Sequence, residues 1–460
     1  MRRPPVPPLV PLALVFLGLA LAAPIARALP PGYSLQLVHT QRAYPTTIRF
    51  APDGRLFYTE LFSGRIMVYP NGTASVPTVW ATVPIATGGE RGLLGMTFHP
   101  DWPDSPYIYV FHSRPNPTYN RIARLRDQGG VGVGYTVLLD SLFANAIGRF
   151  GGRLAFGPDK LLYVSIGDCT IQSAAQNTTS LLGKILRLGL TGKPAPPPGN
   201  PYGVNSPIYA MGVRNPYGLC FDPQTGYGYF SDNGPLCDDE LNRLFPATNY
   251  GWGDEDLCGS QPPGTYPAMM SLTPTVGMTG CTTYRSTKYP GYNGNMFLGS
   301  YEDAAIRRVV FHSTPTTSIV DTVQVWATLP PGEEVHVLDV VQGLDGRIWF
   351  STFDQIWRVL GPETGPVAVE PSPPRERLSV TPNPAQGPVT FGLPGSAPFD
   401  GLEIVDAAGR RVRHWSGPMP TTVIWDGVED DGHLARAGVY WVRGTSAGHT
   451  VSRRWVRIAH

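Results

Sequence analysis

A short strand–turn–strand pattern returns several times along the chain. In residues 49–60, the dipeptide Asp53-Gly54 separates two runs of alternating aromatic and β-branched residues, which is a hairpin signal. Similar copies follow at residues 95–111, 154–165, 219–232 and 340–351. Copies that recur about every 50–60 residues indicate one four-stranded sheet per repeat, which is the pattern of a β-propeller.

The number of repeats predicts six blades. The copies at 219–232 and 340–351 lie far enough apart for one weaker blade around residues 295–311. The 53 glycines, the 49 prolines and the low charged fraction of 15% suit many short strands joined by tight turns. A pair of β-sandwiches is the alternative, but sandwiches seldom contain such internal copies. We therefore predict an all-β chain with a six-bladed β-propeller over residues 29–360.

The C-terminal part of the chain differs from the rest in proline content and in the length of its predicted strands. Residues 361–377 are rich in proline and predict a linker, and residues 378–460 contain short alternating strands that predict a small β-sandwich. Within this tail, four short motifs resemble the FlgD-type immunoglobulin-like module: Asn383-Pro384, Trp425-Asp426-Gly427, Asp431-Gly432 and Gly438-Val439-Tyr440. The resemblance implies a module that attaches the protein to a cell surface.

The N-terminus predicts export. Arg2 and Arg3 precede an apolar run over residues 9–23, and Ala26-Arg27-Ala28 offers an A-x-A cleavage site, so residues 1–28 form a predicted signal peptide. A membrane anchor is the alternative, but the run is short for a span of about 20 residues. No later segment is apolar enough to cross a bilayer. We expect a secreted, periplasmic or cell-surface protein.

Charge and cysteine content exclude several classes of function. A net charge of +1 gives no electrostatic footprint for nucleic acid. The five cysteines contain no C-x-x-C pair, which argues against a zinc knuckle or a thioredoxin-type motif. In an oxidising compartment Cys258 could pair with Cys281, and Cys169 with Cys237. We expect Cys220 to be a buried thiol, because it lies in an apolar strand-like run.

An ordered set of motifs resembles one enzyme family, the soluble glucose and aldose sugar dehydrogenases that depend on pyrroloquinoline quinone (PQQ). The similarity covers about residues 48–359. The matching runs are 92–95 with 98–101, 152–159 with 165–168, 182–188, 212–216, and 233–235 through 239–242 to 249–252. The resemblance implies that a small-molecule sugar loses hydride from its anomeric carbon to PQQ, while a calcium ion polarises the quinone.

The resemblance also implies cofactor-binding residues. Arg214 and Asn215 match the family's cofactor-binding pair, and Glu90 lies where relatives contact the cofactor. Arginine suits the carboxylates of PQQ, because its planar fork binds them through two hydrogen bonds. An alternative is a structural turn at Arg214-Asn215-Pro216 whose arginine forms an internal ion pair.

Two calcium positions follow from the same resemblance. The carbonyl groups of Gly234 and Pro235 match those that hold the activating calcium, and Glu240 and Tyr250 match a second, structural calcium position. Calcium is a hard ion that prefers oxygen ligands, and backbone carbonyls can serve. The alternatives are a tight turn at Gly234-Pro235 and a solvated acidic loop around Glu240.

Other positions depart from the family's pattern, and they concern the chemistry. Arg149 occupies the position of the family's catalytic histidine base, and a guanidinium does not act as a base. Glu302 aligns with a cofactor-facing lysine, and His336 and Leu338 replace two arginines. Asp168 matches the carboxylate beside the base.

Two hypotheses follow. In the first, the protein is an exported PQQ- and calcium-dependent sugar dehydrogenase in which Asp168 acts as the base and Arg149 orients the sugar. In the second, it is a catalytically degenerate propeller that binds a carbohydrate or a protein outside the cell.

Overall fold

The computed structural model divides the chain into two compact units, residues 1–363 and residues 364–460. It describes residues 29–458 apart from gaps at 41–42, 71–72, 74, 117–118, 144–147, 194–198, 254–257, 260, 314–317, 330–334, 363–377, 393–398, 407–409, 421 and 447–448. The predicted signal peptide and nearly all of the predicted linker therefore lie outside the described residues. Each unit is described by itself.

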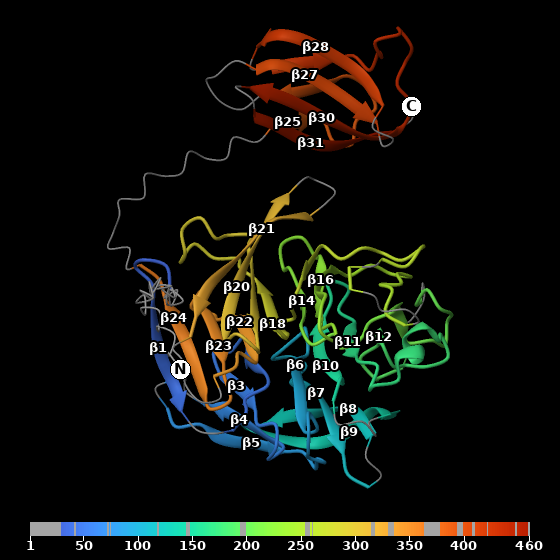
Figure 1. Cartoon of the computed structure of the whole chain (residues 1–460). Helices are drawn as coiled ribbons and strands as arrows, with labels where there is room; N and C mark the ends of the chain where they lie inside the picture. The colour runs from blue at the N-terminus through green and yellow to red at the C-terminus, as the bar shows by residue number, and fades with distance from the viewer. Residues whose placement is uncertain are drawn as a thin grey trace, which may run out of the picture. The chain divides into compact units, whose positions relative to one another are not determined.

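The first unit contains six four-stranded antiparallel sheets (Figure 1). Five of them are built from four consecutive strands. These are β2 (Ile48–Phe50), β3 (Leu56–Thr59), β4 (Arg65–Tyr69) and β5 (Thr78–Thr82); β6 (Leu93–Phe98), β7 (Tyr107–Arg114), β8 (Tyr119–Gln128) and β9 (Val131–Phe143); β10 (Gly151–Phe156), β11 (Leu162–Ile166), β12 (Lys184–Leu188) and β13 (Ile208–Met211); β14 (Leu219–Phe221), β15 (Gly228–Asp232), β16 (Asp239–Arg243) and β17 (Met270–Leu272); and β18 (Met278–Thr283), β19 (Met296–Ser300), β20 (Ala305–Ser313) and β21 (Ser318–Thr328).

The sixth sheet joins the two ends of the unit. It contains β22 (Asp339–Gln342), β23 (Ile348–Ser351) and β24 (Gln355–Leu360), and its outer strand is β1 (Ser34–Thr40). β1 pairs antiparallel with β24, and the two lie side by side in Figure 1 as a blue and an orange strand. Strands from the start and the end of the unit therefore share one blade.

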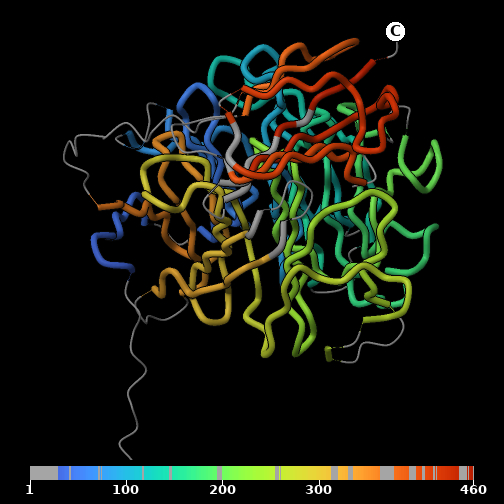
Figure 2. The backbone as a smooth tube through the Cα atoms, turned by 90° about the horizontal axis from the view of Figure 1, so that it is seen from above, coloured from blue at the N-terminus to red at the C-terminus, as the bar shows by residue number. Residues whose placement is uncertain are grey.

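The first strands of the six sheets meet around a common axis. Each contacts the next in the cyclic order β2, β6, β10, β14, β18, β22 and back to β2. The colours of Figure 2 likewise change progressively around the unit. This closed arrangement confirms the predicted all-β propeller, and the weaker repeat at residues 295–311 lies in β19 and β20.

The repeated turns explain why the same motif recurs. Gly54, Gly226 and Gly346 each lie between the first and second strands of a sheet and have φ of +96°, +74° and +73°. This left-handed conformation favours glycine, because other residues place Cβ too close to the backbone. At the equivalent turn before β11, Lys160 adopts φ of +59°.

A buried guanidinium fills the axis of the ring. Arg153, on β10, donates from Nη1 to the carbonyl of Thr46 at 2.6 Å and from Nη2 to the carbonyl of Leu338 at 2.7 Å. Its Nη2 atom lies 3.4 Å from Asp339 Oδ1, and both side chains are nearly inaccessible to solvent. Asp339 Oδ2 in turn accepts the backbone N–H of Ile48 at 3.0 Å. One ion pair therefore connects the first strands of three sheets.

The second unit contains two sheets. One is formed by β25 (Ser379–Thr381), β26 (Val389–Gly392) and β29 (Thr422–Trp425), and the other by β28 (Arg411–Met419), β27 (Phe399–Asp406), β30 (Gly438–Ser446) and β31 (His449–Arg457). A single buried core takes side chains from both sheets, among them Phe391, Ile404, Trp425, Val442 and Trp455. Its assignment to the FlgD-like immunoglobulin type, and the predicted domain limits, stay predictions.

The disulfide in the structure differs from the predicted pairs. Cys237 is bonded to Cys258, so the pairings Cys258–Cys281 and Cys169–Cys237 are wrong. Both bonded cysteines belong to the long stretch between β15 and β17, whereas Cys281 lies on β18 and Cys169 is buried after β11. No helix long and apolar enough to span a bilayer occurs in the part of the chain that the structure describes.

We predict that Arg153→Met lowers the free energy of unfolding by about 3–5 kcal/mol, because it leaves the carbonyls of Thr46 and Leu338 without their donor and Asp339 with Arg49 as its remaining ion-pair partner. The measurement is denaturant or calorimetric unfolding of the full chain. Lys160→Met is the matched control, since Lys160 forms an exposed pair with Asp101 whose loss costs at most about 1 kcal/mol. Equal effects of the two substitutions would contradict the role of Arg153.

Candidate functional site

Loops from distant parts of the chain meet at one end of the ring. In each antiparallel sheet, the segment before the first strand and the segment after the second strand emerge on the same side. Glu90, Arg149, Asn215 and Leu338 precede first strands, and Glu302 follows the second strand β19. The topology therefore brings these sequence-predicted positions to a common end.

A central cavity of about 500 Å³ opens at this end. Its lining includes Glu90, Asn215, Gly234, Pro235, Glu302 and Leu338 among the positions that the sequence singled out. It also includes residues that the sequence did not single out, chiefly Tyr44, Phe62, Tyr217, Asp239, Tyr301 and Phe353. Arg149 and Asp168 are not among its lining residues.

Aromatic rings form one wall of the cavity. Tyr44 packs against Phe353 and Phe62 with ring centroids 4.6 Å and 4.9 Å apart. Tyr301 packs against Phe353 at 5.7 Å and stacks on His336 at 3.9 Å. The Nδ1 atom of His336 lies 2.7 Å from the carbonyl oxygen of Tyr301, which holds the imidazole behind the wall. We call Tyr44, Phe62, Tyr301 and Phe353 the aromatic wall.

The charged side chains that line the cavity are all acidic. They are Glu90, Asp239 and Glu302, and no Lys, Arg or His is found among the described lining residues. Asp239 Oδ2 accepts the backbone N–H groups of Val276 and Gly277, each at 2.6 Å, so its charge is compensated by the backbone. Glu302 is exposed, and burial raises the pKa of Glu90 above its usual range.

Arg149 and Asp168 form a pair beside the cavity. The Arg149 Nη1 atom lies 3.5 Å from Asp168 Oδ2, and the backbone N–H of Arg149 donates to Glu90 Oε2 at 2.9 Å. Asp168 is fully buried and already accepts the indole N–H of Trp252 at 2.9 Å and the backbone N–H of Thr170 at 2.8 Å. Both oxygens of the Asp168 carboxylate therefore already have partners.

Arg214 donates hydrogen bonds to two carbonyl groups at the predicted position of the activating calcium. Its Nη1 atom donates to the carbonyl of Asn233 at 2.7 Å and to that of Gly234 at 2.8 Å. The structure thus brings the predicted cofactor arginine and a predicted calcium-binding carbonyl together. A divalent cation at the Gly234 carbonyl would lie close to the positive charge of this guanidinium, which disfavours its binding there.

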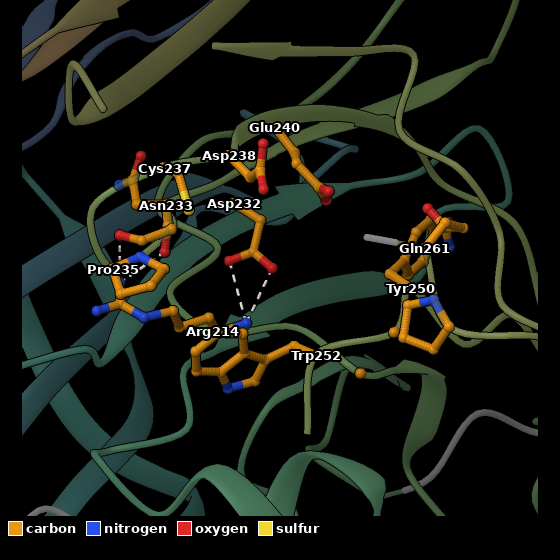
Figure 3. Close-up of a pocket in the computed structure, with 14 residues that line it drawn as sticks. Arg214, Asp232, Asn233, Pro235, Cys237, Asp238, Glu240, Tyr250, Trp252 and Gln261 are labelled. Carbon is orange, nitrogen blue, oxygen red and sulfur yellow. Dashed lines mark hydrogen bonds between the residues drawn. The ribbon is translucent and has the colours of Figure 1, made fainter. Parts of the chain in front are cut away.

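A second, small pocket of about 50 Å³ lies next to this arginine and is drawn in Figure 3. Asp232, Asp238, Glu240 and Tyr250 contribute to its lining. The Asp232 carboxylate accepts the backbone N–H of Arg214 at 2.9 Å, which is marked by dashed lines in Figure 3. Burial, with the nearby charge of Glu240, raises the pKa of Asp232 to about 8.

Sequence reasoning missed Asp232. Its signal was an acidic residue at the end of a fully buried strand, β15, two positions before Gly234 of the predicted Gly234-Pro235 turn. A carboxylate that is desolvated beside a second carboxylate favours a nearby cation, and oxygen donors suit calcium. The donor set of this pocket therefore fits such an ion.

Comparison with known proteins identifies the relatives of the first unit. Residues 42–358 match the family model described as Glucose / Sorbosone dehydrogenase. Quinoprotein glucose dehydrogenase B of Acinetobacter calcoaceticus is 31% identical over 49% of this chain and 54% of its own length. The aldose sugar dehydrogenase of Escherichia coli strain K12 is 26% identical over 60% of this chain and 80% of its own.

Solved structures agree with this comparison. An oxidoreductase of Thermus thermophilus, described as a glucose dehydrogenase, is 30% identical with a TM-score of 0.63, and the match covers 72% of this chain and 100% of that one. The PQQ-bound aldose sugar dehydrogenase of Streptomyces coelicolor is 25% identical with a TM-score of 0.60, and the match covers 72% of this chain and 99% of that one.

Proposed function

The chain belongs to the glucose/sorbosone dehydrogenase family, and we propose that its propeller binds a sugar outside the cytoplasm without oxidising it. One observation carries this proposal: the central cavity is lined by three carboxylates and by no cation among the described residues. The proposal favours the degenerate propeller over the active dehydrogenase, and a carbohydrate over a protein as its ligand.

The charge of the cavity does not fit PQQ. This cofactor carries three carboxylates, and in the resembled family cationic side chains balance them. Here Glu302 stands in place of a lysine, and no cation is found among the described residues that line the cavity. A carboxylate at this position repels the carboxylates of the cofactor where a lysine would attract them, which costs affinity. The cofactor and this lining therefore do not match, and we derive no hydride transfer through it.

The residues at the position of the catalytic base also argue against oxidation of a sugar. Arg149 cannot accept a proton, because its guanidinium stays protonated. Asp168 is the nearest alternative, but its oxygens already contact Trp252, Thr170 and Arg149. A general base must reach the proton that it abstracts, and Asp168 is not among the residues that line the cavity.

A neutral sugar suits the carboxylates and aromatic rings that line the cavity. Sugar hydroxyl groups donate hydrogen bonds, and ionised carboxylates such as that of Glu302 only accept them. The aromatic wall offers apolar faces against which the C–H groups of a sugar ring can pack. A cavity with aromatic walls and a few fixed polar groups is the usual form of a small-molecule site.

The second pocket is proposed as a structural calcium site. Asp232 and Glu240 would supply carboxylate oxygens, and Tyr250 its backbone carbonyl. The Tyr250 side chain is engaged elsewhere, because its hydroxyl donates to the carbonyl of Arg243 at 2.6 Å. The carbonyl of Gly234 accepts a hydrogen bond from Arg214, and the ion is proposed in a structural role only.

Export and attachment complete the proposal. The predicted signal peptide would direct the propeller out of the cytoplasm, and the second unit would hold it at the cell surface. Displayed in this way, a sugar-binding cavity can meet carbohydrates that do not enter the cell.

We predict no sugar-dependent dye reduction when the mature protein is mixed with PQQ, calcium and a panel of aldoses. Glu302→Lys should tighten PQQ binding by about tenfold or more, because it converts a repulsive charge at the cavity into an attractive one. The measurement is titration of the cofactor's absorbance. Asp104→Lys makes the same charge change at an exposed position outside the cavity and should leave PQQ binding unchanged. Sugar-dependent turnover by the wild type would overturn the proposal.

We predict that Tyr301→Ala weakens sugar binding by about ten- to hundredfold, since truncating an aromatic anchor in a pocket typically costs about 1–3 kcal/mol. Binding is measured by calorimetry with the sugar that binds most tightly in a panel. Tyr119→Ala is the control, because that ring contacts Arg114 on β7 and does not line the cavity. If no sugar in the panel binds the wild type, the ligand is not a simple carbohydrate.

We predict that calcium stabilises the propeller by about 2.7 kcal/mol when its concentration is one hundred times the dissociation constant. The measurement is thermal unfolding with added calcium and then with excess chelator. Glu240→Gln should abolish the stabilisation, whereas Asp104→Asn, at an exposed site outside the small pocket, should retain it. An equal calcium effect in Glu240→Gln would place the ion elsewhere.

A further inference from the structure

Two reduced cysteines face each other across a seam between neighbouring blades. Cys220 lies on β14 and Cys281 on β18, which are the first strands of adjacent sheets and contact each other near the axis. Their Sγ atoms are 2.6 Å apart. This separation is too short for two unbonded sulfur atoms, and a disulfide bond is about 2.0 Å long. A small shift of either side chain would therefore complete the bond.

The third reduced cysteine has no such neighbour. Cys169 is fully buried, and its thiol donates to the carbonyl of Phe143 at 3.1 Å. Cys220 is half-buried, whereas Cys281 is buried. The chain thus contains one thiol pair placed for oxidation and one isolated thiol as an internal reference.

We propose that Cys220 and Cys281 form a second disulfide bond when the protein matures under oxidising conditions. The oxidant is a low-molecular-weight disulfide such as oxidised glutathione. One cysteine thiolate attacks it and releases the first small thiol, and the other cysteine then attacks the mixed disulfide and releases the second. One Cys220–Cys281 bond forms, one small disulfide is reduced, and the two protons pass from the cysteines to the released thiols.

The bond would strengthen a seam that lacks backbone pairing. The sheets of β14–β17 and β18–β21 are separate, and side chains bridge them at this point: Asn233 Nδ2 donates to the carbonyl of Met278 at 3.0 Å, and Ser231 Oγ to that of Thr279 at 3.3 Å. Asn233 and Thr279 also line the central cavity. A covalent link between the strands would therefore hold one side of the cavity at a fixed width.

The new loop would also enclose the first disulfide. It spans 61 positions in sequence between Cys220 and Cys281, and Cys237–Cys258 lies within it. Closing a loop of this length restricts the unfolded chain strongly, which stabilises the folded state in the chain-entropy description. For a propeller of this size, we expect the melting temperature to rise by about 5 °C.

Thiol counting and peptide mapping test the proposal directly. The purified mature protein is incubated with oxidised glutathione, denatured, labelled with a thiol reagent and digested without reduction. We expect one free thiol per chain, Cys169, and one peptide that links Cys220 to Cys281 beside the Cys237–Cys258 peptide. Three free thiols with Cys237–Cys258 as the only linked pair would overturn the proposal, and so would a bond that involves Cys169.

Melting temperatures provide a second test. In wild type, reduction should lower the melting temperature by the combined effect of both disulfides, and in Cys220→Ser by about 5 °C less. Cys169→Ser is the control, since it removes a thiol without a sulfur partner and should keep the full redox difference. An identical redox difference in wild type and Cys220→Ser would contradict the second bond. These results do not depend on whether the cavity binds a sugar.

Discussion

The propeller depends on a charge that it keeps away from water. Where the first strands of the six sheets meet, Thr46 and Leu338 lie close to first strands and present their backbone carbonyl groups. Arg153 satisfies both of these carbonyls, and its positive charge is balanced by Asp339, which in turn holds the backbone of Ile48. Removing one partner of such a buried pair is strongly destabilising, so the packing of the ring and the base of the cavity depend on the same ion pair.

The fold could be predicted because each blade repeats a local rule. The turn glycines at positions 54, 226 and 346 share one backbone conformation, and period-two alternation around them marks the strands. Cysteine pairing could not be predicted in this way, because it depends on which strands meet across a seam. Cys281 faces Cys220 only after two sheets have packed together. The closeness of Asp232 to Glu240, and the use of the Gly234 carbonyl by Arg214, likewise arise from tertiary contacts.

Under the proposed function, family membership and ligand chemistry are separate properties of this chain. The residues that stabilise the ring, such as Arg153 and Asp339, are buried and do not determine which ligand the cavity binds. The loop positions Arg149 and Glu302 can change charge or lose a base without disturbing a strand, since they lie outside the sheets. A propeller can therefore keep its architecture while the charged side chains that line its cavity change.

The shared blade of β1 and β24 also sets an order of events during biogenesis. Residues 34–40 have no partner strand until residues 355–360 have been synthesised, because β1 pairs with β24 at the edge of its sheet. The nascent ring thus stays open, with an unpaired edge, through most of translation. On the proposed export route, the ring would close once, after its last blade has crossed the membrane.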